Sequence, residues 1–200
     1  MKTLVIVDFQ RDFANNKGAL YVPGAENAEQ KIISYINNNH SDISDVIFTI
    51  DWHSPNHCSF KNNGGMWPNH CVQYTEGAGI VTDLLNICLY YNLPIKIFKK
   101  GNVDNIEEYG AFHEIEKYEE GDNIDIVTTN ISGDDTIIFE NKDVVVCGLA
   151  GDYCVKTTID NLLQCEDLNV SAFIDGIASI DGGKTFNQFV EDMNLKIERV

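Results

Sequence analysis

The stretch GLAGDYCVKTT places Cys154 a few residues after an apolar run, where a strand can turn into a helix. A cysteine at the first turn of a helix feels the partial positive charge of that terminus, which favours the thiolate and raises its nucleophilicity. The common alternative is a buried cysteine that only fills space in the core. The position of Cys154 therefore raises a hypothesis of thiol chemistry that other residues must support.

A nucleophilic thiol needs a proton acceptor, and Asp8 directly follows the apolar run at 3–7. Lys100 ends another apolar run and would keep the Asp8 carboxylate charged and oriented. Backbone N–H groups around Gly151 and Cys154 could bind a developing oxyanion. Taken singly, Asp8 could be a helix cap and Lys100 a solvated turn residue. Their shared position at strand ends is the stronger observation.

A second group of residues has the chemistry of metal ligands. In DWHSPNHC, residues 51–58, an aspartate and a histidine stand two positions apart. With His70 in MWPNHC, Asp51 and His53 predict a site for one divalent cation, most simply Zn, with Mn or Fe as alternatives. His57 stays open between a fourth ligand, an orienting residue and loop packing. A structural zinc site that also uses the cysteines after His57 and His70 is the rival, although those cysteines lack the usual short spacing.

The elements that must position these residues follow from the apolar runs. Short apolar runs separated by helix-length segments are typical of a parallel sheet buried on both faces. We predict strands at 3–7, 46–50, 94–98, 143–147 and 170–174, and helices at 26–39, 78–91, 153–165 and 183–192. This order predicts a three-layer α/β/α fold with a doubly wound, mostly parallel sheet, as a single domain over residues 1–200. In such sheets ligands bind beyond the carboxyl ends of the strands, where the candidate residues stand.

Two segments do not fit the simple alternation. Residues 51–77 form a long polar loop with three histidines, and loops of this length in compact domains are usually functional or disordered. We take this loop to be functional. Residues 124–140 alternate around a Ser-Gly-Asp-Asp turn signal and predict an added hairpin.

Composition excludes several classes of protein. The chain has 200 residues and a formal net charge of −17, which repels nucleic acids and anionic lipid surfaces. The amino terminus lacks an apolar run long enough for a signal peptide or a membrane span, so we expect a cytoplasmic protein with no membrane partner. Six cysteines without a C-x-x-C pair indicate reduced thiols.

Five blocks of sequence, in order, resemble the nicotinamidases, also called pyrazinamidases, of the isochorismatase-like cysteine hydrolase superfamily. They are VDFQRDF at 7–13, DWHSPNHCSF at 51–60, WPNHC at 67–71, KG at 100–101 followed by YGAF at 109–112, and GLAGDYCV at 148–155. Together they span roughly residues 3–180, and their order makes the resemblance far more specific than any single block.

The resemblance implies a role for each candidate residue. It implies a catalytic triad of Asp8, Lys100 and Cys154, and a metal held by Asp51, His53 and His70 with water completing its shell. It also implies a cis peptide between Ala150 and Gly151 that helps to aim oxyanion donors. By position, the aromatic residues that would sandwich the substrate ring are Phe13, Trp67 and Tyr109.

The resemblance also has departures. Gly110 stands where relatives often have Ser, and Gly151 where they often have Thr, so some hydrogen bonds around the site are expected to be missing. Neither departure changes a catalytic side chain. The segment 124–140 is longer than the family pattern, which could alter a sheet edge or an oligomer contact.

The implied activity is hydrolysis of nicotinamide to nicotinate and ammonia through a thioester, as in NAD salvage, with pyrazinamide as a further substrate. The alternative is a related cysteine amidase that acts on a carbamoyl or ureido compound. It needs no metal to hold a ring, so the D-x-H and WPNH motifs count against it. A non-catalytic metal-binding or interaction protein should have lost a member of the triad, and none is lost. The expected partner is a small pyridine carboxamide, and a homo-oligomer stays open.

Overall fold

The computed structural model describes residues 1–120 and 123–199. Its main sheet has six strands in the order β3-β2-β1-β7-β8-β9, and every adjacent pair is parallel. The strands are β1 Lys2–Val7, β2 Ile43–Asp51, β3 Ile95–Lys100, β7 Asp143–Gly148, β8 Asn169–Ile177 and β9 Lys196–Glu198. The five predicted strands are confirmed, and the short β9 is an addition at the edge.

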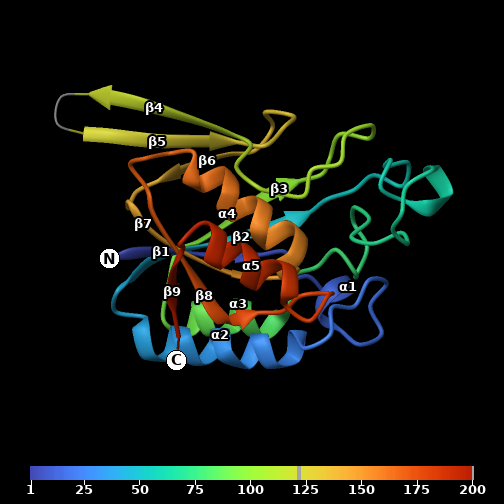
Figure 1. Ribbon diagram of the computed structural model, residues 1–200, viewed down its shortest axis with the longest axis horizontal. Helices are drawn as coiled ribbons and strands as arrows, with labels where there is room; N and C mark the ends of the chain where they lie inside the picture. The colour runs from blue at the N-terminus through green and yellow to red at the C-terminus, as the bar shows by residue number, and fades with distance from the viewer. Residues whose placement is uncertain (121–122, 200) are drawn as a thin grey trace.

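Helices cover both faces of this sheet, which confirms the α/β class (Figure 1). The bounds are α1 Arg11–Ala14, α2 Ala25–Asn39, α3 Thr82–Tyr90, α4 Lys156–Leu163 and α5 Lys184–Asp192, with a 3-10 turn at Lys61–Asn63. The helix predicted at 153–165 begins differently, because Gly151–Val155 forms a π-helical turn ahead of α4. Within the described residues, none of the helices has the length and apolarity that a membrane span requires.

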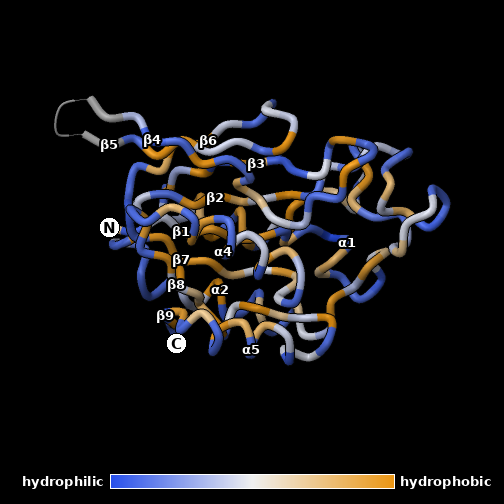
Figure 2. The backbone as a smooth tube through the Cα atoms, turned by 45° about the horizontal axis from the view of Figure 1, so that its top comes forward, coloured by the Kyte–Doolittle hydropathy of each residue, from blue (hydrophilic) through white to orange (hydrophobic). Residues whose placement is uncertain are grey.

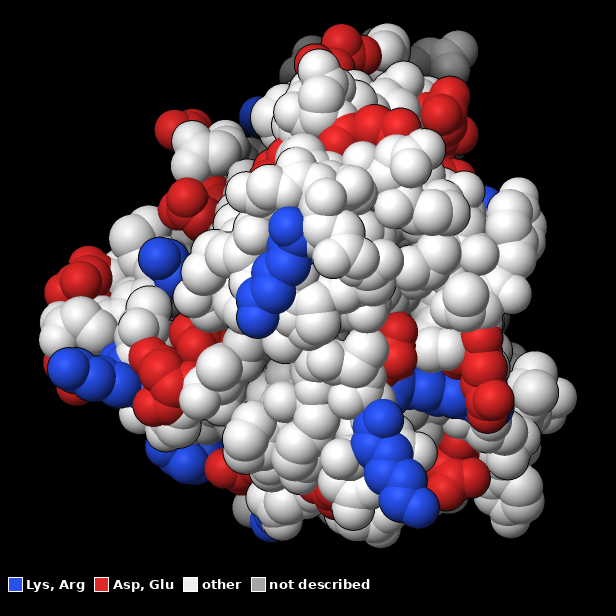
Figure 3. All heavy atoms as spheres, turned by 90° about the vertical axis from the view of Figure 1, so that its right-hand side faces the viewer, with Lys and Arg blue, Asp and Glu red and all other residues white. Residues whose placement is uncertain are grey.

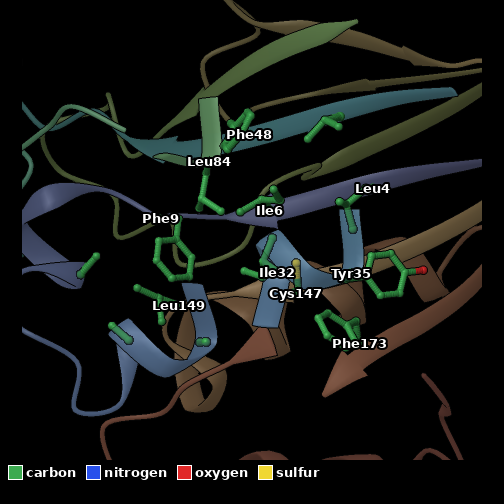
Figure 4. Packing of buried hydrophobic residues seen from close by; sticks show 14 of the residues in the cluster. Leu4, Ile6, Phe9, Ile32, Tyr35, Phe48, Leu84, Cys147, Leu149 and Phe173 are labelled. Carbon is green, nitrogen blue, oxygen red and sulfur yellow. The ribbon is translucent and has the colours of Figure 1, made fainter. Parts of the chain in front are cut away.

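The alternation of side chains along each strand builds two separate cores. In β1, Leu4 and Ile6 point to the face covered by α2 and α3, whereas Val5 and Val7 point to the face covered by α4 and α5. Figure 4 shows Ile6 beside Ile32 of α2, and Leu4 near Tyr35 of the same helix. Burying one such side chain contributes about 1.5–3 kcal/mol. The apolar central strands in Figure 2 are therefore what fixes the sheet between its helical layers.

A smaller antiparallel sheet lies beside β3. It consists of β4 Glu114–Glu120, β5 Asn123–Thr129 and β6 Thr136–Phe139, in that order. The predicted hairpin is confirmed as β5 and β6. Strand β4 was not predicted, because its charged sequence EIEKYEE resembles a solvated segment. The Lys99 N–H donates to Asp135 Oδ2 at 2.8 Å and the Asn130 side chain donates to the Lys99 carbonyl at 3.0 Å, so this sheet covers the edge of β3.

The parallel register brings the carboxyl ends of β1, β2, β3 and β7 to one end of the molecule. Val7 pairs with Thr49 and with Gly148, and Asp51 pairs with Lys100. Gly148 has φ 124°, and a Cβ there would lie 2.2 Å from the Val7 carbonyl oxygen, so only glycine fits at this close approach. The candidate residues therefore meet where the strands end.

Figure 3 looks at the end of the molecule on the right of Figure 1, beyond α1 and the loop at 51–77. On this face the Lys and Arg side chains stand apart from one another, and Asp and Glu side chains lie between several of them. The described part of this face therefore carries no continuous basic patch of the kind that nucleic-acid phosphates require.

Candidate active site

Lys100 is the centre of a buried network of charges. Its side chain is fully buried, and its Nζ lies 2.8 Å from Asp8 Oδ2 and also contacts Asp51 Oδ1. The same atom lies 3.8 Å from Cys154 Sγ and donates to the Glu108 carbonyl at 3.3 Å. Burial alone would lower the pKa of Lys100, but the charges of Asp51 and Asp8 raise it well above its usual value. Lys100 is thus a fixed cation that joins the thiol to the candidate metal ligands.

One carboxylate oxygen of Asp8 is hydrogen-bonded to Thr49, and the other is available for proton transfer. Thr49 Oγ1 donates to Asp8 Oδ1 at 2.7 Å, and the backbone of Asp8 is left-handed, with φ 47°. Oδ2 forms the ion pair with Lys100 but, among the described residues, makes no well-aligned hydrogen bond. Burial raises the pKa of Asp8, and the Lys100 charge opposes this rise. Oδ2 is therefore placed to take up a proton.

Cys154 is held as a thiol until a base takes its proton. It is 7% exposed and lies in the π-helical turn before α4 rather than in the first turn of an α-helix. Burial raises the pKa of Cys154 well above its usual value, and Lys100 only partly offsets this. The cost of burying a charged thiolate therefore outweighs the stabilisation that was expected from a helix terminus. An oxygen of Asp8 lies within 4.8 Å of Cys154 Sγ, which supplies the missing base.

The three predicted metal ligands converge. Asp51, His53 and His70 each offer one atom, and these atoms lie within 4.8 Å of one another. Asp51 Oδ2 lies 3.4 Å from His53 Nε2 and 3.7 Å from His70 Nε2. Burial would raise the pKa of Asp51, but Lys100 and then His53 hold it well below its usual value, so the ligand is ionised. A buried carboxylate between two imidazoles fits a divalent cation of the zinc type.

Backbone carbonyls orient both imidazoles. His53 Nδ1 lies 2.7 Å from the Gly101 carbonyl, and His70 Nδ1 lies 2.7 Å from the Pro68 carbonyl. Each contact assigns the proton to Nδ1 and turns Nε2 toward Asp51. Metal-ligating histidines are commonly oriented by such a hydrogen bond at the other ring nitrogen.

His57 lies beside the predicted metal ligands, and backbone groups engage its ring. Its Nε2 lies 3.0 Å from the Ile106 carbonyl, and its Nδ1 accepts the Ser59 N–H at 3.3 Å. Both ring nitrogens are thereby engaged by backbone groups. Its ring centroid lies 4.1 Å from that of His53, and burial lowers the pKa of His57 to about 4, so a neutral ring supports His53.

Gln10 and Asp12 of the motif VDFQRDF hold the backbone at or beside two predicted metal ligands, and neither role was predicted from the sequence. The Gln10 side chain donates to the Asp51 carbonyl at 2.8 Å and accepts the Asp51 N–H at 2.8 Å. Asp12 Oδ2 accepts the Cys71 N–H at 2.8 Å, beside His70. Their place in VDFQRDF was a signal that the motif does more than supply Asp8, but their partners are more than 40 residues away in sequence.

A pocket with about 380 Å³ of empty volume, including its open mouth, joins the thiol to the metal ligands. The three predicted ring-binding aromatics all line it, as do Asp51, His70 and Cys154. Trp67 Nε1 donates to the Tyr109 hydroxyl at 3.1 Å, and the Phe13 ring lies 5.4 Å from the ring of His70. Tyr153, which was not predicted, adds a ring 5.2 Å from Trp67 at 87°. This aromatic lining suits one planar aromatic ligand.

The expected cis peptide is present but one residue earlier. It joins Leu149 to Ala150, and not Ala150 to Gly151 as predicted. The Gly151 N–H donates to the Ala178 carbonyl at 2.8 Å, so this group cannot serve as an oxyanion donor. The prediction was wrong because the motif defines the order of the residues but not which peptide bond is cis.

The two glycines that depart from the family pattern are explained by close packing. A Cβ at Gly151 would lie 2.3 Å from Ser179 Oγ, and a Cβ at Gly110 would lie 2.7 Å from Thr157 Cγ2. These distances are shorter than real Cβ contacts allow. The neighbouring side chains therefore occupy the space that Ser and Thr would fill.

Two acidic residues beyond Lys100 were also missed, since a Glu pair in a polar loop resembles a solvated surface. Glu108 is buried, and its side chain accepts the Gly101 N–H at 2.7 Å and the Ile131 N–H at 2.8 Å. Glu107 lines the pocket. Burial and then the Asp51 charge raise the pKa of Glu107. Only the folded chain shows that Glu107 lines the pocket and that Glu108 holds the backbone beside Lys100.

Comparisons with known proteins point to one family. No family model matches the chain. The nicotinamidase of Acinetobacter baylyi is 30% identical over 218 residues, which covers 98% of this chain and 91% of that protein. The nicotinamidase of Saccharomyces cerevisiae is 29% identical over 182 residues, which covers 79% of each chain.

Solved structures agree with these relatives. The pyrazinamidase of Pyrococcus horikoshii, solved in complex with zinc, superposes with a TM-score of 0.73 at 29% identity, over 100% of this chain and 99% of that one. PnC1 from L. infantum, solved in complex with nicotinate, superposes with a TM-score of 0.75 at 25% identity, over 100% and 92% of the two chains. Similarity over nearly the full length of both chains means that the site lies within the compared region.

Proposed function

The chain belongs to the nicotinamidase family, and we propose that it hydrolyses nicotinamide to nicotinate and ammonia with Cys154 as the nucleophile. The observation that supports the proposal is that one pocket is lined both by the candidate nucleophile and by candidate metal ligands. Cys154, within reach of Asp8 and Lys100, lines this pocket, and so do Asp51 and His70 of the predicted metal-ligand cluster. A pyridine carboxamide has a carboxamide group that the thiol can attack and a ring nitrogen that a metal ion can bind.

The residues of this chain suffice for acyl transfer through a thioester. Asp8 takes the proton of the Cys154 thiol, and the thiolate attacks the carboxamide carbon. The C–N bond then breaks as Asp8 returns the proton to nitrogen, and ammonia leaves. A water molecule, deprotonated by Asp8, attacks the thioester, so nicotinate is released and the thiol is restored. Lys100 stays protonated throughout and holds Asp8 in place.

Backbone N–H groups of Ala150 and Cys154 are the proposed oxyanion donors. Both residues line the pocket, and Gly151 is excluded because its N–H is already bonded to Ala178. Donors that are fixed before the reaction stabilise the developing charge without reorganisation, which is commonly worth about 2.7–4 kcal/mol per donor.

Asp51, His53 and His70 would hold one divalent metal ion. When bound, the ion supplies a Lewis acid for the pyridine nitrogen. We propose zinc, because one carboxylate and two imidazoles suit it and because the P. horikoshii relative was solved with zinc. The same donor set also accepts Mn or Fe.

The aromatic walls define the substrate class. Phe13, Trp67 and Tyr109 would hold a flat ring, with Phe13 close to the metal side through His70. Pyrazinamide has the same ring shape and the same carboxamide, so we propose it as a second substrate. A carbamoyl or ureido compound lacks a ring for these walls to hold.

Ammonia release from nicotinamide by zinc-loaded protein tests the proposal. We expect turnover by the wild type and a loss of at least a thousandfold in Cys154→Ala, with nicotinate formed in equal amount to ammonia. Asp51→Asn separates the metal from the thiol, because it should retain the thiol but bind substrate poorly. If the loaded wild type releases ammonia only from a carbamoyl substrate, the nicotinamidase assignment is wrong.

A further inference from the structure

The pocket contains a carboxylate that none of the roles above uses. Glu107 lines the pocket together with Asp51 and His70. Its carboxylate accepts no hydrogen bond and forms no ion pair with any residue in the ranges 1–120 and 123–199. A pocket carboxylate without a protein partner needs a ligand, a cation or water to complete its interactions.

Glu107 lies near the candidate metal ligands but outside their group. One carboxylate oxygen lies within 4.8 Å of ring nitrogens of His53 and His57, which form a second group of possible ligands. Glu107 is not a member of the group formed by Asp51, His53 and His70. Two ligands of one zinc ion, each bound at about 2.1 Å, lie at most about 4.2 Å apart. Glu107 therefore would reach the ion through a water molecule rather than by direct ligation.

The backbone on both sides of Glu107 is anchored. The carbonyl of Ile106 accepts from His57 Nε2 at 3.0 Å. On the other side, the Glu108 side chain accepts two backbone N–H groups, and its carbonyl accepts from Lys100 Nζ at 3.3 Å. These contacts fix the backbone that carries Glu107, so its side chain starts from a defined position beside the pocket.

The net charge of the site with a bound divalent ion would be positive, which favours a further carboxylate nearby. Asp8 and Asp51 share the single cation Lys100, so the three groups carry one net negative charge. A divalent ion beside Asp51 would turn this balance positive by one charge. Glu107 is a carboxylate on the same pocket wall that is not paired with Lys100, and it lies close to His53.

We infer that Glu107 is an outer-sphere residue of the metal centre: it accepts hydrogen bonds from water bound to the ion and thereby strengthens metal binding. The inference rests on the proposed metal site at Asp51, His53 and His70. Carboxylates in this role at other metal sites typically change metal affinity by about 10–100-fold when they are replaced.

Calorimetric titration of metal-stripped protein with Zn²⁺ tests this inference. We expect the apparent Kd for Zn²⁺ to rise at least tenfold in Glu107→Gln and to recover at least in part in Glu107→Asp. Glu191→Gln removes an exposed carboxylate elsewhere and serves as the charge control, with an unchanged Kd. The circular dichroism spectrum of each metal-free variant verifies that the fold is retained.

The outcomes separate this inference from the function on which it rests. A Kd for Glu107→Gln within twofold of the wild type overturns the role of Glu107 if Asp51→Asn abolishes Zn²⁺ binding in the same assay. If Asp51→Asn also binds Zn²⁺ normally, the proposed metal site is wrong and the role of Glu107 is overturned with it.

Discussion

Replacing Lys100 with Met should expose how strongly the site depends on one buried cation. The methionine keeps an aliphatic stem of similar length, so packing changes little, but Asp8 and Asp51 lose their shared partner. Removing one member of a buried ion pair costs about 3–5 kcal/mol, since the remaining charge is left uncompensated. We therefore expect Lys100→Met to lower the free energy of unfolding at pH 7 by about 3–5 kcal/mol.

The loss should depend on pH with a definite sign. In the wild type, the pKa of Asp51 lies well below its usual value, so its contribution to stability is present above the unfolded pKa and is lost as pH falls through the folded one. Without Lys100, burial raises the pKa of both carboxyls above their unfolded values of about 3.9. The folded variant then takes up protons as pH falls. The stability difference between the two proteins should therefore narrow from pH 7 to pH 5.

Urea denaturation followed by circular dichroism, with a chelator present, measures these differences. Lys142→Met is the control, because its ion pair with Asp167 is long, at 3.7 Å, and half exposed, and it should cost less than about 1 kcal/mol. The double variant Asp8→Asn with Lys100→Met should recover part of the loss, since Asn tolerates the left-handed backbone of Asp8. A loss below 1 kcal/mol for Lys100→Met, or one that grows toward pH 5, would refute the reasoning.

Three further predictions concern the packing, the metal and its support. Gly110→Ser should lower the free energy of unfolding by about 1–3 kcal/mol, because the added Cβ would lie 2.9 Å from the backbone carbon of Thr157. Differential scanning calorimetry should show a lower Tm. An unchanged Tm would contradict the packing argument. Gln10→Leu removes three hydrogen bonds, two of them to the backbone of Asp51, and should weaken Zn²⁺ binding about tenfold by calorimetric titration; full affinity would mean that the backbone is held without it. Chelation of the metal should raise the KM for nicotinamide more than it lowers kcat in steady-state kinetics, whereas an intact KM with kcat abolished would assign the metal to the chemical step.

The sequence predicted that the candidate residues share one edge of the sheet, because ligand sites in parallel sheets lie beyond the carboxyl ends of the strands, whereas the roles of these residues came from the family resemblance. Asp8, Asp51, Lys100 and Cys154 each follow an apolar run, and strand ends in such a sheet meet at one edge. Five predicted strands and the α/β class follow from the same runs. Spacing alone could not order the strands, but it placed the chemistry at the right end of the sheet.

What the sequence could not predict depends on contacts between distant segments. The role of Gln10 as a clamp on Asp51 requires the register of β1 and β2, and the sign of the Cys154 pKa shift requires its burial. Strand β4 is too charged to be told from a loop until it pairs with β5. Glu107 resembles a solvated residue until the chain around it is anchored on the pocket wall.

The central claim is that Cys154 carries the acyl group during hydrolysis of nicotinamide. The most direct measurement is acid quenching of the zinc-loaded enzyme during turnover, followed by mass spectrometry of its peptides. We predict a nicotinoyl group on the peptide that contains Cys154, and neither adduct nor ammonia release in Cys154→Ala. Steady release of ammonia by Cys154→Ala, or a nicotinoyl group on a different residue, would contradict the account.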